Sequence, residues 1–379
     1  MWNINNIREK KKYVEQRLKT CSDSVEKEKL ELSLLAYYYL ISNSGTIRYT
    51  KFYNFMDKIS GNKFSLVKDN KYAKMENRIV FGEMPILDSN YINFLIQLLL
   101  NITNQKSLES LSETKLEKLI IPSESLKEIS KSFYRQFGDN EICTNAMKLL
   151  DDDDALNFTS NIRRGYTDFG GITVYDYIFK KAYCNVAQQS NYFDLQATNH
   201  EVMHGVDFYF KPKLESEIYH GFHEIPTYTI DYFFIDYLEQ IGLKQEEVQK
   251  LRMQKEYYLY YLSNSALLDI RLKTTLLMKK IKDGIDVSDE VMEIITPNIL
   301  TKILEVESGI IAFGLYKQIT EDKEKGIANL KEILKNGVAK KQIPNFSHIG
   351  LSNNDLLQLA NQIGTYSKSS QINIQNKKL

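Results

Sequence analysis

The chain has 379 residues, of which 43% are hydrophobic and 26% charged. This is the composition of an ordinary soluble globular protein, large enough for two domains or one large domain with a deep cleft. Lys and Arg balance Asp and Glu at 49 each, so the chain has no net charge that would attract nucleic acid or an anionic membrane. The three cysteines are odd in number and far apart, which argues against a disulfide framework and favours a reducing compartment.

The N-terminal residues carry no recognisable export signal. Residues 1–12 are polar and then basic, and no apolar core of a signal peptide follows them. The longest apolar stretch, residues 91–102, is interrupted by Asn93 and Gln97 and is too short to span a bilayer. We therefore expect a cytoplasmic protein with no membrane partner, and secretion without a cleaved signal stays open.

The N-terminal region is predicted to form a helical hairpin. Only six prolines and 17 glycines interrupt the chain, so most of it is expected to be helical. Apolar residues recur at helical spacing over residues 4–20 and 24–42. Residues 21–24 between them supply turn and capping side chains.

Two further helices and an acidic loop follow. Residues 88–90 can cap an apolar helix over 91–102, and residues 122–125 open another over 126–137. The acidic run 151–154 lacks the alternating ligands and central Gly of an EF-hand loop. It is therefore predicted to be a solvated loop or helix end.

The centre of the chain contains the strongest strand signal. Gly170 and Gly171 introduce a β-branched and aromatic run over residues 172–179, and residues 182–186 could be its hairpin partner. A helix is predicted from about residue 194 to residue 210, where Lys211 and Pro212 end it.

The remaining chain is again helical in pattern. A helix is predicted over residues 224–241, with Gly242 as its C-terminal stop. Helical spacing continues to residue 280 and recurs over residues 299–335. The tail, residues 366–379, is polar and is expected to fray.

The most informative motif is the pentapeptide from His200 to His204, which reads His-Glu-Val-Met-His. Four of the five histidines, including His220 and His223, fall within residues 200–223. On a helix His200 and His204 lie one turn apart on one face, so both imidazoles can reach one Zn²⁺. Glu201 then lies beside the ion and can take a proton from water.

A catalytic zinc usually takes a third protein ligand. The metzincin pattern is excluded, because Asp207 and Phe210 stand where it has Gly and His. The remaining candidates are Asp207, His220, His223 and Glu224. Glu224 is favoured because a carboxylate at the start of the next helix can project back onto the metal, whereas Asp207 is better placed to accept from a ligand imidazole. Asp231, two turns further on, could hold a ligand histidine.

These residues, in this order, resemble the M3 family of zinc peptidases, and within it the oligoendopeptidase F branch. The family has an Asp six residues before its first zinc His, as Asp194 precedes His200. It has a third-ligand Glu followed by a hydroxyl residue three positions later and a carboxylate at seven, which match Glu224, Thr227 and Asp231. The resemblance covers roughly residues 78–360, with similar sequence in the segments 81–100, 125–150, 161–171 and 308–337.

The chain departs from the family in three respects. Members are longer in their N-terminal part, so we expect a wider cleft or one completed by a second subunit. Met203 stands where the family usually has Gly, which a helix interior tolerates. Residues 296–306 contain no His or Tyr where the family carries its oxyanion-stabilising side chains, and loss of such a donor typically costs about 10²–10³ in rate. Candidates for a replacement or for substrate contacts are Tyr219, His220, His223, Tyr228, Tyr316 and His348.

We therefore predict a mainly α-helical, zincin-like metallopeptidase with a small β-sheet beside the zinc-binding helix. Residues 1–115 would form one wall of the cleft, residues 116–365 the catalytic domain and residues 366–379 a flexible tail. The resemblance implies one Zn²⁺ per chain on His200, His204 and Glu224, with Glu201 as general base and Asp194, Asp207 and Asp231 in supporting positions.

The expected substrate is a peptide or an unstructured polypeptide segment, hydrolysed as by an endopeptidase. The edge of the strand near residues 174–177 could pair with an extended peptide. Nucleic acid is not an expected partner, because the aromatic cluster 257–261 lacks a basic stripe. Two other functions stay open: a non-catalytic or weakly active peptide- or protein-binding descendant, and a dedicated protease for one protein target, as in toxins. The oligomeric state is open, with a dimer as one option.

Overall fold

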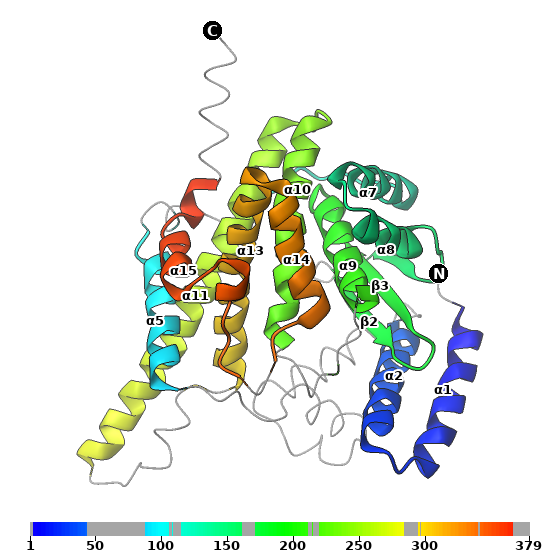
Figure 1. The fold of residues 1–379 in the computed structure, drawn as a ribbon, viewed down its shortest axis with the longest axis horizontal. Helices are drawn as coiled ribbons and strands as arrows, with labels where there is room; N and C mark the ends of the chain where they lie inside the picture. Colours follow the sequence, from blue (N-terminus) through cyan, green and yellow to red (C-terminus); the bar gives the residue numbers. More distant parts are fainter. Residues whose placement is uncertain are drawn as a thin grey trace. The chain divides into compact units, whose positions relative to one another are not determined.

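The computed structural model describes residues 3–43, 88–105, 115–160, 171–210, 220–283, 297–339 and 342–366, with the single residues 108, 214 and 295. It is mainly helical with one small sheet (Figure 1), as predicted. Two compact units are present. The first comprises Met1–Glu83, Lys118–His220 and Leu334–Asn336, and the second Met84–Glu117, Gly221–Ile333 and Gly337–Leu379. The predicted division at residues 115 and 365 stays a prediction.

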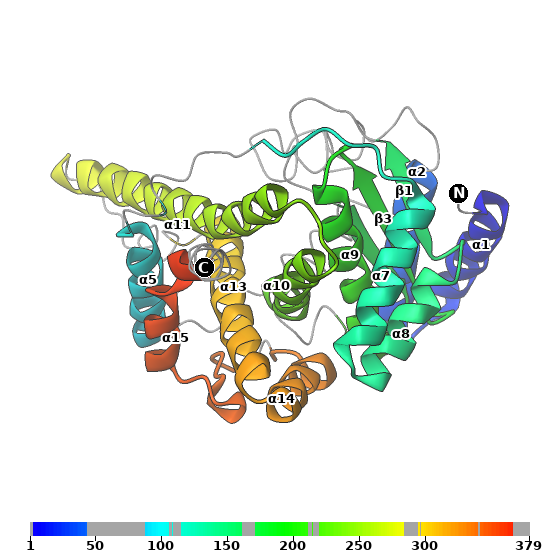
Figure 2. The same cartoon turned by 90° about the horizontal axis from the view of Figure 1, so that it is seen from above.

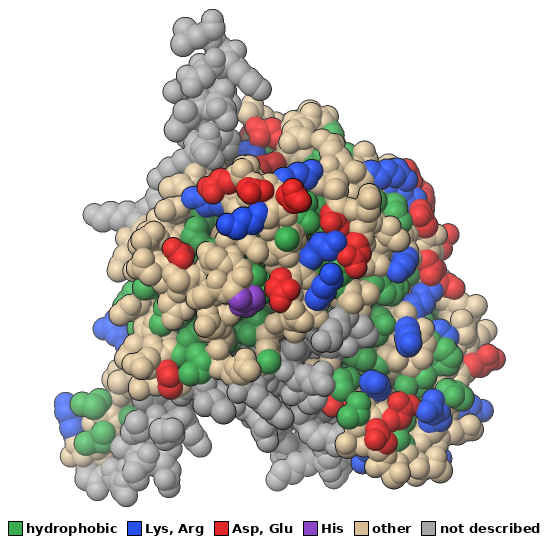
Figure 3. Space-filling view, in the orientation of Figure 1, with side chains coloured by type: hydrophobic (Ala, Val, Ile, Leu, Met, Phe, Trp, Pro, Cys, Tyr) green, Lys and Arg blue, Asp and Glu red, His purple; other side chains and the backbone are tan. Residues whose placement is uncertain are grey.

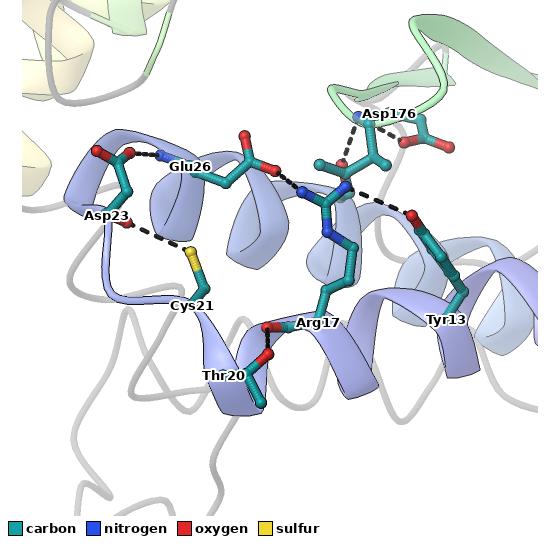
Figure 4. Close-up of polar contacts among 9 residues, drawn as sticks. Tyr13, Arg17, Thr20, Cys21, Asp23, Glu26 and Asp176 are labelled. Atoms are coloured by element: carbon teal, nitrogen blue, oxygen red, sulfur yellow. Dashed lines mark hydrogen bonds and ion pairs between the residues drawn. The ribbon is translucent and has the colours of Figure 1, made fainter.

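The first unit begins with the predicted hairpin, α1 (Ile4–Thr20) and α2 (Ser24–Asn43). The turn is closed by side chains, as Figure 4 shows: the Asp23 carboxylate accepts the Glu26 N–H at 2.7 Å, and Arg17 reaches the Glu26 carboxylate at 2.7 Å. An Asp at the helix start satisfies a backbone donor that has no partner within the helix. The capping role predicted for residues 21–24 is therefore confirmed.

The sheet of the first unit has three described strands in the order β1-β3-β2. The strands are β1 (Leu156–Ser160), β2 (Gly171–Asp176) and β3 (Lys181–Gln188). β2 and β3 form the predicted antiparallel hairpin, while β1 runs parallel to β3 and was not predicted. β1 is only five residues long, with the sequence Leu-Asn-Phe-Thr-Ser. Its Asn157 Nδ2 donates to Asn185 Oδ1 of β3 at 3.0 Å. So short a run is a weak signal for a strand, and its partner is distant in the sequence.

The strand predicted over 172–179 ends earlier, at Asp176. The Asp176 carboxylate accepts the backbone N–H groups of Ile178 and Phe179, each at 3.0 Å, and Lys180 has a positive φ of 53°. An Asp that binds the backbone two residues on forms a turn in place of ladder pairing. The apolar run therefore continues past the end of the strand.

Helix α9 (Phe193–Phe210) covers one face of this sheet and the N-terminal hairpin covers the other. Successive strand residues point to opposite faces. Tyr175 accordingly stacks on Phe208 of α9, with ring centroids 5.0 Å apart. The next residue, Asp176, points to the opposite face and accepts a hydrogen bond from the hydroxyl of Tyr37 on α2. The alternation of β2 thus sets up three layers, with α9 and the hairpin separated by the sheet.

Two more helices support α9 from its other side, α7 (Ser123–Phe137) and α8 (Asn140–Leu150). Figure 2 shows them running next to each other. The acidic run that follows α8 is a turn, as predicted, and its carboxylates pair with lysines: Lys127 with Asp153 at 2.6 Å and Lys131 with Asp151 at 2.9 Å.

The described part of the second unit is mainly helical. The predicted helices appear as α5 (Ser89–Thr103), α10 (Glu224–Gln240) and α11 (Gln245–Lys282). The predicted helical stretch 299–335 is two helices, α13 (Pro297–Glu321) and α14 (Lys323–Asn336), because Asp322 accepts the Lys325 N–H and starts a new helix. A short helix, α15 (Asn353–Ala360), and the single turns η1 (His220–His223), η2 (Ser347–Ile349) and η3 (Ile363–Thr365) complete this part of the chain.

Helix α10 packs on α13 and α11, and α5 packs on α11, α13 and α15. The predicted tail begins with a residue that is not frayed: Tyr366 is buried, and its hydroxyl donates to the Tyr232 carbonyl and to Asp236, each at 3.1 Å. Its aromatic ring makes it part of the core, which the polar composition of the segment conceals. Residues 367–379 lie outside the described residues.

Charges are mixed on the face seen in Figure 3, where Lys and Arg lie among Asp and Glu. This agrees with the balanced composition. In the described ranges no helix combines the length and apolar character needed to cross a membrane.

Candidate metal centre and active site

The His-Glu-Val-Met-His motif lies on α9, as the sequence predicts. His200 and His204 are half-buried, and their rings stand edge to face with centroids 4.8 Å apart. This is the arrangement expected for residues one helical turn apart. The two imidazoles are therefore close enough to share one ion.

The Glu201 side chain is buried, with 4% of its surface exposed. Its carboxylate accepts a hydrogen bond from Thr173 Oγ1 of β2 at 2.8 Å. The same hydroxyl lies 2.9 Å from the Glu201 carbonyl oxygen, and the Cys184 thiol of β3 donates to that carbonyl at 3.3 Å. The side chain predicted as general base is thus held between the helix and the sheet.

Asp194, the residue six positions before His200, is fully buried and organises the connection between β3 and α9. Its two carboxylate oxygens accept the backbone N–H groups of Gln189 at 2.6 Å and Ser190 at 3.1 Å. Burial raises the pKa of Asp194, and these backbone donors oppose the rise. Ser190 has a positive φ of 59°, so the carboxylate stabilises a tight turn that sets where α9 starts.

Glu224 is the first residue of α10 and is half-buried. Thr227, the hydroxyl residue three positions later, donates to the Glu224 carboxylate at 3.1 Å and lies 2.9 Å from its carbonyl oxygen. A hydroxyl in the first turn can therefore orient a carboxylate that starts the helix. The spacing of these two residues in the sequence has this local meaning.

Asp231 lies two turns along α10 and is buried against a lysine that the sequence did not single out. Lys255 Nζ of α11 stands 3.0 Å from Asp231 Oδ2, and both side chains are almost fully buried. The same ammonium lies over the rings of Tyr228 at 4.2 Å and Tyr232 at 4.9 Å. Burial lowers the pKa of Lys255, and the neighbouring Asp231 carboxylate opposes the shift. A lysine in a helical pattern gives no sequence signal of such a role.

His200, His204 and Glu224 form a group that could hold a metal ion: one ligand atom from each lies within 4.8 Å of the others. Two imidazole nitrogens and one carboxylate oxygen are a donor set of catalytic zinc sites, which leave a further position for water. Asp207, an alternative third ligand, is buried one turn beyond His204 and is not in this group of described side chains. The residues present therefore fit Zn²⁺.

The candidate oxyanion or substrate residues are spread over several elements. Tyr316 of α13 donates its hydroxyl to Asp236 at 2.6 Å, and His348 is exposed in η2. His223 is half-buried directly before α10. His220 opens η1, but its side chain and the whole of Tyr219 lie outside the described residues.

Tyr228, another of these candidates, contacts the segment that lacks a His or Tyr. It lies one turn after Glu224 and donates to Glu305 Oε1 at 2.8 Å. Tyr258 of α11 donates to the same oxygen at 2.6 Å. Burial and the Glu305 charge raise the pKa of Tyr228. The sequence placed Tyr258 only in an aromatic cluster and gave no reason to select Glu305, because their meeting depends on three helices.

No protein-family model matches the chain, and no curated protein matches it in sequence. Solved structures do match. A provisionally assigned peptidase from Chlamydophila abortus has a TM-score of 0.54 and 13% identity, over 89% of this chain and 64% of that chain. A provisionally assigned oligoendopeptidase F has a TM-score of 0.53 and 12% identity, over 90% of this chain and 70% of that chain.

A further provisionally assigned oligoendopeptidase F, from Bacillus anthracis str. Ames, has a TM-score of 0.49 and 14% identity, over 93% of this chain and 64% of that chain. This chain therefore spans about two thirds of the length of these structures. At such identities the likeness concerns the fold. On the two matches with the higher TM-scores, this chain has the fold of the oligoendopeptidase F-type peptidases.

Proposed function

We propose that this protein is a zinc-dependent endopeptidase. The observation that carries the proposal is the grouping of His200, His204 and Glu224, whose ligand atoms lie within 4.8 Å of one another, together with the buried Glu201 next to His200 in the motif. A purely structural metal site needs no base beside its ligands, whereas hydrolysis does. The shared fold of the peptidases named above supports the same assignment.

The reaction would be hydrolysis of a peptide bond. Zn²⁺ bound there would polarise the scissile carbonyl and lower the pKa of the attacking water. Glu201 would take one proton from that water as its oxygen bonds to the carbonyl carbon, and pass the proton to the leaving nitrogen as the C–N bond breaks. The products are a carboxylate and a free amine.

The substrate would be an extended segment of peptide or unstructured polypeptide. β2 is the last strand in the order β1-β3-β2 of the described sheet, and it carries Thr173, which holds Glu201. An edge strand can pair with a peptide through main-chain hydrogen bonds, which tolerate many sequences. We therefore propose that substrate binds along β2.

The test combines metal analysis with digestion of a mixed peptide library. Wild-type protein should contain about one Zn²⁺ per chain and cut peptides at internal bonds. Glu201→Gln should keep its zinc and lose nearly all hydrolysis, because an amide cannot accept the water's proton. Glu224→Ala and His204→Ala should lose zinc, and a Glu224→Ala protein with unchanged zinc affinity would show that the third ligand is assigned wrongly.

A second candidate function is a peptide- or protein-binding module that retains zinc without turnover. It is favoured by the segment 296–306, which contains no His or Tyr that could stabilise an oxyanion. The hydroxyls of Tyr228 and Tyr258 both donate hydrogen bonds to Glu305 of this segment. A zinc-loaded wild-type protein that cuts no peptide at neutral pH would select this function. Binding of library peptides by that same protein would then identify its ligands.

A further inference from the structure

Three residues of the sheet form a seat for Glu201. Thr173 of β2 and Cys184 of β3 are direct cross-strand partners. Gly171 lies two residues before Thr173, and residues two apart on a strand share a face. All three contact Glu201 of α9 and therefore face that turn of the helix.

The seat fits both the backbone and the side chain of Glu201. Thr173 Oγ1 lies 2.8 Å from the Glu201 carboxylate and 2.9 Å from its carbonyl oxygen, and Cys184 Sγ lies 3.3 Å from that carbonyl. Burial raises the pKa of the Cys184 thiol, which keeps it in the protonated, donating form. A single hydroxyl thus ties the carboxylate to the backbone of its own residue.

Gly171 provides the space in which the Glu201 side chain lies. A Cβ at residue 171 would stand 2.5 Å from Glu201 Cγ, 2.8 Å from Cδ and 2.4 Å from the Asn185 carbonyl oxygen. These separations are shorter than van der Waals contact. The side chain of Glu201 therefore lies directly against the strand backbone and has little freedom to change rotamer.

We propose that Thr173 is a positioning residue for the general base, acting through its hydrogen bond to the Glu201 carboxylate. The inference rests on the proposed peptidase function. A base must be held within a fraction of an ångström of its working position, and a misplacement of about 1 Å can cost about 10²-fold in rate. The hydroxyl of Thr173 supplies that hold from a rigid strand.

Each critical variant differs from wild type at one non-hydrogen position of the Thr173 side chain. Thr173→Val keeps the shape of the side chain and removes the hydroxyl, while Thr173→Ser keeps the hydroxyl. Thr159→Val is the matched control: Thr159 lies half-buried on β1 of the same sheet and accepts a hydrogen bond from Asn185 Nδ2 at 3.2 Å. It loses a sheet hydrogen bond without touching Glu201.

In zinc-loaded protein Thr173→Val should lower kcat by about 10- to 100-fold, with KM and zinc content unchanged. Thr173→Ser should restore kcat to within a few-fold of wild type, and Thr159→Val should leave kcat unchanged. A Thr173→Val protein with wild-type kcat, or an equal loss in Thr159→Val, would overturn the inference.

A second readout does not depend on catalysis. In urea unfolding of metal-free protein, Thr173→Val should lower the midpoint more in the wild-type background than in Glu201→Ala, because the bonded pair is already broken there. Equal midpoint shifts in both backgrounds would refute the seat. If wild-type protein cuts no peptide, the proposed function fails, and this cycle alone decides whether Thr173 holds Glu201.

Discussion

Asp231 and Glu307 are both buried carboxylates of the second unit, but they have different partners. Asp231 faces the Lys255 ammonium at 3.0 Å. Glu307 Oε2 accepts only a neutral phenol, the hydroxyl of Tyr91 at 2.6 Å, and its Oε1 has no hydrogen-bond partner among the described residues. A buried carboxylate is stabilised in its charged form by a cation and in its neutral form by an apolar site. The two residues should therefore respond differently to substitution and to pH.

Lys255→Met should lower the free energy of unfolding by about 3–5 kcal/mol, the typical cost of removing one partner of a buried ion pair. The ammonium that neutralises Asp231 is lost while the carboxylate stays buried. Urea unfolding measures the effect. The double variant Lys255→Met/Asp231→Leu should regain part of the loss, and a double variant as unstable as the sum of the single ones would contradict this account.

Glu307 should make stability depend on pH. Its pKa is raised by burial from 4.5 to about 8, so between these values the folded protein holds a proton that the unfolded chain has released. The stabilisation is complete below about pH 4.5 and is lost as the pH rises to about 8. Glu307→Gln, neutral at every pH, should therefore exceed wild type in its free energy of unfolding above pH 8, by an amount on the order of a few kcal/mol, and its Tm should be higher there.

Thermal unfolding from pH 5 to pH 9 tests this. The curve for Glu307→Gln should diverge from wild type as the pH rises through that window. Glu324→Gln, at an exposed site on α14, is the control and should run parallel to wild type. Parallel curves for Glu307→Gln would show that Glu307 is charged in the folded protein.

At the scale of the elements, α9 is positioned by close approach on two sides. The sheet contacts it through the Glu201 seat, and α8 contacts it at Gly205. A Cβ on Gly205 would stand 2.5 Å from Leu149 Cδ1 of α8 and 3.3 Å from Cys184 Sγ. A glycine next to His204 thus lets α8 and β3 approach the helix that carries both histidines.

Gly205→Val should separate α9 from α8 and lower stability by about 1–3 kcal/mol, the usual cost of overpacking a core. Because Gly205 follows His204 directly, zinc affinity should fall as well. Leu149→Ala removes the obstructing methyl groups, and the double variant should recover zinc affinity. Competition with a chelator measures this, and unchanged affinity in Gly205→Val would contradict the role of this contact.

At the scale of the whole molecule, zinc should stabilise the fold in proportion to its binding. A ligand that binds only folded protein adds about 2.7 kcal/mol at 100 times its Kd. Tm should therefore rise with zinc concentration in wild type and in Glu201→Gln, and stay constant in His204→Ala. A zinc-dependent rise of equal size in His204→Ala would place the ion elsewhere.

The sequence by itself determined the helical class and most helix limits. These features depend on signals that act within a few residues. Asp88 caps a helix by accepting the Tyr91 N–H, and Gly242, with a φ of 83°, ends another. The spacing of His200, Glu201 and His204 is equally local, because one helical turn fixes which of them share a face. These features could be predicted because neighbouring residues alone decide them.

Only the tertiary structure decided what meets these residues. β1 pairs with β3 in parallel, and Thr173 and Cys184 donate hydrogen bonds to Glu201. Lys255 forms an ion pair with Asp231. Glu305 accepts hydrogen bonds from Tyr228 and Tyr258. Each of these contacts joins residues from different elements, many positions apart in the chain. The periodicity of a single sequence does not show which residues of different elements meet. The packing of helices and strands, and not local backbone preference, brings these partners together.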